Sequence, residues 1–135
     1  MKESSEMRYL LDTVALVRHF TGKGKIGNKA AYILDTVDEN EHDFVISVIS
    51  LMEVMYLAEK NRIEISLSET FNLINSSSRY TVANLNPEIL KVAEFIDFYE
   101  LHDRLILATA KWIGIRIISS DSKFDGIEGI KVVWD

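Results

Sequence analysis

Cysteine is absent from the 135-residue sequence, and proline occurs only once. Without cysteine the chain can form neither a disulfide framework nor a thiolate metal site. No apolar run approaches the roughly 20 residues of a membrane-spanning helix, and the N-terminal MKESSE does not have the pattern of a signal peptide. Repeats, low-complexity tracts and Pro- or Gly-rich linkers are also absent. These absences predict one cytoplasmic domain over residues 1–135, frayed at 1–6 and without membrane attachment.

Basic residues are few, because 15 lysines and arginines stand against 21 aspartates and glutamates, for a formal net charge of −6. This charge has the wrong sign for a protein that binds nucleic acid through surface charge alone. It does not exclude a nucleic-acid substrate, because divalent cations held among clustered acids reverse the local field. A hydrophobic fraction of 47% is ordinary for a globular domain of this size, which can bury a substantial core.

Short apolar strands alternate with amphipathic helices along the chain. Strands are expected over residues 7–11, 44–47, 80–83, 115–118 and 130–134, and helices over 14–20, 28–37, 49–57, 67–74, 87–98 and 101–113. Asn86 and Pro87 are typical of a helix start, and Gly114 is typical of a helix end. The alternation predicts an α/β fold, with a mostly parallel, twisted sheet of about five strands and helices on both faces.

Four acids occupy positions where packing alone would not place them. Asp12 and Asp121 follow the ends of apolar strands, while Glu53 and Asp103 interrupt the apolar faces of helices. In open α/β sheets, ligands bind at the carboxyl ends of the strands, and this topology would bring the four acids to that edge. A buried carboxylate must be paired, hydrogen-bonded, protonated or bound to metal. Hard oxygen donors of this kind favour Mg²⁺ or Mn²⁺ over zinc.

Each acid also has a simpler explanation. Asp12 and Asp121 could cap the segment that follows each of them. Asp103 could be a first-turn acid favoured by the helix dipole, and Glu53 could pair with a base such as Arg104. A purely structural α/β module would require bases to neutralise these acids. His102, beside Asp103, could reach a site or simply begin its helix, and all three histidines are interpreted as surface or helix-end residues.

A phosphotransfer domain of the receiver or haloacid dehalogenase type also places aspartates at strand ends. Both types need a second acid beside the first. Here Thr13 and Val14 follow Asp12, which disfavours phosphotransfer.

Four segments together resemble a known family. DTVALV at 12–17, SVISLMEV at 47–54, LHDRLILATA at 101–110 and IISSDSKF at 117–124 are similar, in order and spacing, to the four signature blocks of the PIN domain and, more narrowly, of VapC-like toxins. The resemblance covers nearly the whole chain. It implies a PIN fold, a Mg²⁺- or Mn²⁺-dependent ribonuclease that hydrolyses RNA phosphodiester bonds, and often a homodimer bound by an antitoxin protein.

The resemblance assigns an acidic quartet to catalysis and metal binding: Asp12, Glu53, Asp103 and Asp121. In supporting positions, Thr13 matches the small hydroxyl residue after the first acid, Ser119 stands where the family usually has threonine, and Asp125 is an auxiliary acid. Val14 departs from the family, which often has asparagine there. The alternative function is a PIN-like module without activity that only binds RNA or a protein partner.

Segments 49–57, 67–74 and 89–98 are rich in apolar residues, more than one small sheet needs for its cover. Met52 and Tyr56 share a helical face with Glu53, and that face is expected to be buried. The surplus of apolar helical faces predicts a symmetric homodimer with helical contacts.

Overall fold

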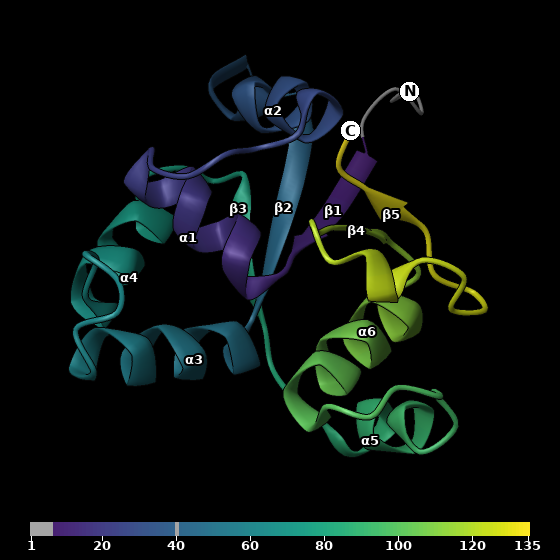
Figure 1. Cartoon of the computed structure of the whole chain (residues 1–135). Coiled ribbons are helices and arrows are strands. Elements are labelled where there is room, and N and C mark those ends of the chain that lie inside the picture. Colours follow the sequence, from purple (N-terminus) through teal and green to yellow (C-terminus); the bar gives the residue numbers. More distant parts are fainter. Residues whose placement is uncertain (1–6, 40) are drawn as a thin grey trace.

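A single five-stranded sheet forms the centre of the protein (Figure 1). The computed structural model describes residues 7–39 and 41–135, so the expected fraying of residues 1–6 lies outside the described residues. The strands are β1 (Met7–Leu11), β2 (His42–Ser47), β3 (Tyr80–Ala83), β4 (Arg116–Ile118) and β5 (Val132–Val133). Their order is β3-β2-β1-β4-β5, and every pairing is parallel. The predicted α/β fold is confirmed.

The helices are α1 (Thr13–Thr21), α2 (Asn28–Leu34), α3 (Val48–Glu59), α4 (Leu67–Asn75), α5 (Pro87–Ala93) and α6 (Leu101–Ile113), with 3-10 turns η1 (Asp35–Glu39) and η2 (Ser122–Phe124). Their ends follow local chemistry. The Ser47 side chain accepts the Ile49 N–H at the start of α3, and Gly114 ends α6 with a φ of 82°. Within the described residues, no helix is long and apolar enough to cross a membrane.

Helix α5 is shorter than the sequence predicts, because it ends at Ala93 and not at residue 98. After it, the N–H groups of Phe95 and Ile96 bond to carbonyls three residues back, at 3.1 Å each, so the chain tightens into turns. The tightening keeps Ile96 in the core and turns Phe95 outward, where it is 82% exposed. The last strand is likewise shorter than the expected 130–134.

Alternate residues of the central strands pack against different helices. Tyr9 and Leu11 contact the core formed with α1, α2, α3 and α4. Leu10 faces the opposite side, where the core is built mainly by α5 and α6. Figure 1 shows α5 and α6 together on one side of β1 and α1 and α2 on the other. Both faces of β1 are therefore covered, as expected for a parallel sheet.

Polar residues end or directly follow three adjacent strands. Asp12 comes directly after β1, Ser47 is the last residue of β2, and Ser119 directly follows β4. The Asp12 N–H donates to the Ile118 carbonyl at 3.1 Å, which joins the ends of β1 and β4. The carboxyl edge of the sheet therefore presents side chains from neighbouring strands side by side.

Candidate active site

A cavity of about 620 Å³ opens at the carboxyl edge of the sheet, and all four predicted acids line it. They come from different elements: Asp12 from the end of β1, Glu53 from α3, Asp103 from the first turn of α6, and Asp121 from the segment after β4. Thr13 and Val14 also line the cavity. The structure thus brings together residues that are far apart in the sequence.

Asp12 is the most deeply buried of the four acids, with 6% of its surface exposed. Its carboxylate accepts the Ala15 N–H at 2.8 Å and a hydrogen bond from the Ser119 side chain. Burial nevertheless raises the pKa of Asp12 above its usual value, and the charges of Asp121 and Glu53 raise it further. Asp12 does cap α1, as the simpler explanation has it. Its hydrogen bonds, however, lower its pKa by less than burial raises it.

Asp103 is only partly buried, yet its pKa is raised to about 6. Burial is the largest cause, and the charge of Glu100 comes next. The charges of the other three predicted acids also contribute to this rise, which shows that the four carboxylates share one field. Position in the first turn of a helix favours an ionised acid, so the simpler explanation for Asp103 does not account for the direction of its pKa.

Glu53 is contacted from two other helices. One carboxylate oxygen, Oε1, accepts a hydrogen bond from Thr13 of α1. The other, Oε2, lies 3.7 Å from Nδ1 of His102 in α6. Within the described residues these are the partners of Glu53, and Arg104 is not among them. In the simpler explanation Glu53 pairs with a base, and the base that the structure places beside it is His102 and not Arg104.

Asp121 is joined to Asp12 through Ser119. The Asp121 N–H donates to the Ser119 hydroxyl oxygen at 3.0 Å, and the Ser119 side chain in turn bonds to Asp12. Asp121 also caps η2 by accepting the Lys123 N–H at 2.9 Å. Asp125 does not line the acidic cavity. It lies with Asp121 at a neighbouring hollow of about 300 Å³.

The acids suit a divalent cation by chemistry more than by preformed geometry. Carboxylate oxygens are the donors that Mg²⁺ and Mn²⁺ prefer. Within the described residues, however, no three His, Asp or Glu side chains are arranged closely enough to hold an ion. Like charges repel one another, and this repulsion adds to burial in raising the pKa of Asp103. The four carboxylates thus share the cavity without converging on one point, and a cation among them would offset their charge.

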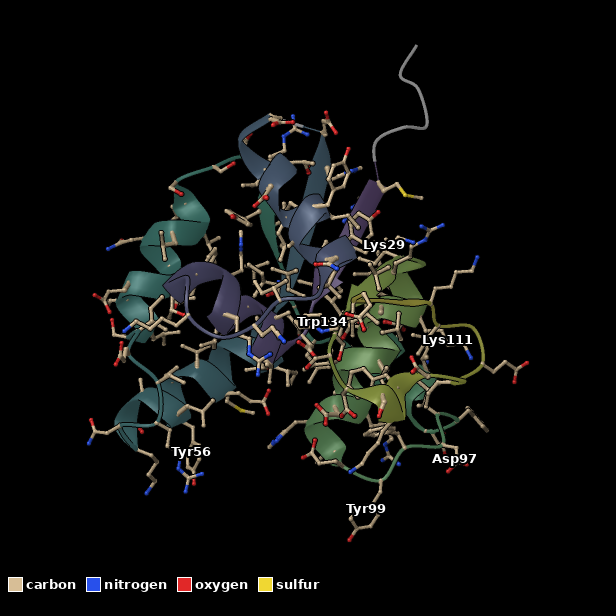
Figure 2. All side chains as sticks on the ribbon, turned by 45° about the horizontal axis from the view of Figure 1, so that its top comes forward. Lys29, Tyr56, Asp97, Tyr99, Lys111 and Trp134 are labelled. Carbon is tan, nitrogen blue, oxygen red and sulfur yellow. The ribbon has the colours of Figure 1, made fainter. Side chains whose placement is uncertain are left out.

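The apolar wall of the cavity comes from α3, which corrects one prediction. Met52 and Tyr56 were expected to be buried, but they are 41% and 52% exposed. Both line the cavity, and Tyr56 projects from α3 in Figure 2. The face of α3 that packs into the core instead carries Leu51 and Val54. Glu53 lies between these two faces, which explains why it appeared to interrupt a buried stripe.

Of three further polar residues near the acids, Glu100 and Ser50 were not predicted from the sequence, and His102 was considered able to reach a site but was interpreted as a helix-end residue. His102 lines the cavity beside Glu53. Glu100 caps α6 by accepting the Asp103 N–H at 2.7 Å, and its charge is one of the causes, after burial, of the raised pKa of Asp103. Ser50 is completely buried and bonds to Thr13. Glu100 and Ser50 each lie three residues before a predicted acid, a spacing that puts two side chains on one helical face, and His102 directly precedes Asp103. These positions were the available signal.

Comparison with known proteins gives a consistent result. The PIN domain family model matches residues 9–130. Among solved structures, VapBC2 from Rickettsia felis bound to a DNA fragment from the promoter aligns with a TM-score of 0.71 and 19% identity, covering 96% of this chain and 100% of that one. DNA-bound VapBC from Salmonella typhimurium aligns at 0.69 and 20%, covering 94% and 97%.

A toxin–antitoxin complex from Klebsiella pneumoniae aligns with a TM-score of 0.61 and 26% identity, covering 90% of this chain and 94% of that one. No curated protein matches the sequence. The family model spans most of the chain, including all four acids, and the parallel sheet carries those acids to one edge. The chain therefore belongs to the PIN domain family.

Proposed function

We propose that this protein is a metal-dependent endoribonuclease that hydrolyses RNA phosphodiester bonds and acts in the cytoplasm as the toxin of a type II toxin–antitoxin pair. The observation that carries the proposal is the meeting of four carboxylates in one cavity of a PIN domain. A lone structural acid would be neutralised by a base, whereas here the charges that raise the pKa of Asp103, after burial, are those of other acids. Such a concentration of negative charge is unfavourable unless a cation joins it.

In this proposal Asp12, Asp103 and Asp121 hold Mg²⁺ or Mn²⁺, with Glu53 bound directly or through water. A divalent ion in such a site supplies an activated water and neutralises charge on the phosphate. The residues of the chain supply the placement. Ala15 and Ser119 fix the Asp12 carboxylate by hydrogen bonds, and burial at the sheet edge limits the access of bulk water to it.

The purified protein is expected to cut RNA when Mg²⁺ or Mn²⁺ is present and to stop when EDTA is added. The reason is that the acids alone repel a phosphate, so the substrate approaches only when cations reverse the local field. Gel analysis of a labelled RNA, with each ion added back after EDTA, measures this.

The add-back distinguishes this protein from a contaminating nuclease that needs no metal, which would continue to cut in EDTA. Binding of RNA with no cleavage under any divalent ion would favour the alternative, a PIN-like module without activity, over the proposed enzyme.

We also propose an antitoxin partner. The solved structures that resemble this chain include toxin–antitoxin complexes, and the acidic protein, with its net charge of −6, suits a basic partner. The exposed apolar wall formed by Met52, Met55 and Tyr56 adjoins the acids. An antitoxin that covers this wall would close the cavity, and its addition is expected to stop RNA cleavage.

The protein is expected to be a homodimer, which light scattering would report as about twice 15.4 kDa at tens of micromolar. Large apolar side chains remain exposed near α5 and the start of α6: Leu90, Phe95, Tyr99 and Leu101. Tyr99 projects from the molecule in Figure 2. Exposed apolar groups of this kind mark protein interfaces. A monomer at this concentration would contradict the prediction.

A further inference from the structure

Glu53 is held through a chain of hydroxyl groups that begins in its own helix. The Ser50 hydroxyl oxygen lies 3.0 Å from the Thr13 hydroxyl oxygen, and the Thr13 hydroxyl contacts Oε1 of Glu53. Ser50 and Glu53 are three residues apart in α3, so their side chains share one face of the helix. Thr13 reaches this face from the first position of α1. The three groups therefore join α1 to α3 at the edge of the cavity.

The order of donors in this chain follows from the number of protons. A threonine hydroxyl has one hydrogen, and an ionised carboxylate can only accept. Thr13 must therefore give its hydrogen to Glu53, so the bond between the two hydroxyls is donated by Ser50. Ser50 has none of its surface exposed, and water cannot readily replace its hydroxyl. Without Ser50, Thr13 would lose the partner that fixes its rotation.

We propose that Ser50 is a positioning residue for the metal-binding acids, acting through Thr13 on Glu53. The inference rests on the proposed metal-dependent function. Nδ1 of His102, in α6, lies 3.7 Å from the second carboxylate oxygen of Glu53, Oε2. The Ser50–Thr13 pair and His102 together therefore set the orientation of this carboxylate. Groups that hydrogen-bond to metal ligands set the orientation of those ligands, and their loss typically weakens metal affinity or activity about 10–100-fold.

The test compares Ser50→Ala with Ser50→Thr, which keeps the hydroxyl, in the full chain. Calorimetric titration with Mg²⁺ alone, without RNA, is expected to show affinity lowered about 10-fold or more in Ser50→Ala and largely restored in Ser50→Thr. In RNA cleavage, Ser50→Ala is expected to lower kcat with little change in KM, because the substrate-facing surface is unchanged.

Thr109→Ala is the matched control for loss of a buried hydroxyl. Thr109 is buried in α6, and its hydroxyl donates to the Leu105 carbonyl at 2.8 Å, away from the acids. This variant is expected to melt at a lower temperature and to bind Mg²⁺ as the wild type does. If Ser50→Ala fails to fold, Ser50→Cys takes its place, because it keeps the volume and donates only weakly.

Equal Mg²⁺ affinity in wild type and Ser50→Ala would overturn the inference while leaving the proposed function intact. Weakened binding in Ser50→Ala that Ser50→Thr does not restore would also overturn it, unless circular dichroism showed the threonine variant to be misfolded. A wild-type protein that binds no Mg²⁺ would overturn the proposed function itself, and the role of Ser50 with it.

Discussion

Replacing Asp12 with asparagine is expected to slow RNA cleavage by roughly a hundredfold to a thousandfold, since loss of one preorganised electrostatic contact in an active site costs about 10²–10³ in kcat. Asparagine keeps the size of the side chain and an oxygen that can accept the Ala15 N–H. It removes the negative charge that the proposed cation needs. Single-turnover cleavage at saturating Mg²⁺, with circular dichroism to confirm folding, measures the effect.

Asp97→Asn is the matched control for this substitution. Asp97 is exposed and lies outside the acidic cavity, at a separate hollow that Lys111 also lines, and Figure 2 shows both residues at the outer side of the molecule. The control variant is expected to cleave at the wild-type rate. Wild-type activity in Asp12→Asn, in a preparation free of other nucleases, would show that Asp12 is not a metal ligand.

Mg²⁺ is expected to raise the melting temperature of the wild type by about 10 °C, and Asp103→Asn is expected to lose most of that gain. At a hundredfold excess over its dissociation constant, a ligand bound only by the folded state stabilises by about 2.7 kcal/mol. For a domain of this size, 1 kcal/mol corresponds to about 4 °C. Melting curves in Mg²⁺ and in EDTA measure both variants.

In EDTA the effect of Asp103→Asn on the melting temperature is expected to reverse, so that the variant melts higher than the wild type. The pKa of Asp103 is about 6 in the folded state, above the ordinary 3.8, so its ionised form destabilises the fold at pH 7. The full shift of about two units would correspond to about 3 kcal/mol, but Asp103 is half exposed and screening reduces this to about 1 kcal/mol. Loss of the favourable helix-dipole contact opposes it by about 0.5 kcal/mol. Asp103→Asn is expected to melt about 2 °C higher than wild type in EDTA.

The pH dependence of this difference follows from the same pKa. As pH falls from 7 toward 4, folded Asp103 takes up a proton before the unfolded chain does, so the wild type gains stability from this group. The asparagine variant lacks that gain, and the two melting temperatures are expected to approach each other. An Asp103→Asn protein that melts clearly lower than wild type in EDTA would support a structural role for this acid.

The periodicity of the sequence was sufficient to predict the sheet and the edge of the sheet at which the acids lie. The apolar strand before Asp12 and the one before Asp121 pair directly as β1 and β4, and parallel pairing alone brings their ends together. Helical register was less informative, because α3 has apolar residues on most of its surface. Nothing in the pattern distinguishes Val54, which enters the core, from Met52, which lines the cavity.

Hydrogen-bonded partners were harder to predict than acids. A carboxylate on an apolar face is unusual enough to be noticed in a sequence. A buried serine such as Ser50 is common, because a hydroxyl group costs less free energy to bury than a charge. His102 was interpreted as a helix-end residue, which it also is, since α6 begins at Leu101. Its approach to Glu53 depends on how closely α3 and α6 pack, and that distance is set by the whole core.

The pairing of β1 with β4 also has a consequence during translation. Tyr9 pairs with Arg116, so nearly every other element is synthesised before the central strand gains its second neighbour. Contacts between such distant residues form slowly, because a long loop must close first. Until β4 leaves the ribosome, Asp12 lacks both the Ile118 carbonyl and the Ser119 side chain, and Asp121 cannot reach the sheet edge. The proposed ribonuclease site therefore cannot assemble before β4 is free of the ribosome, and in that proposal the delay would protect the ribosome and the messenger RNA that are producing the chain.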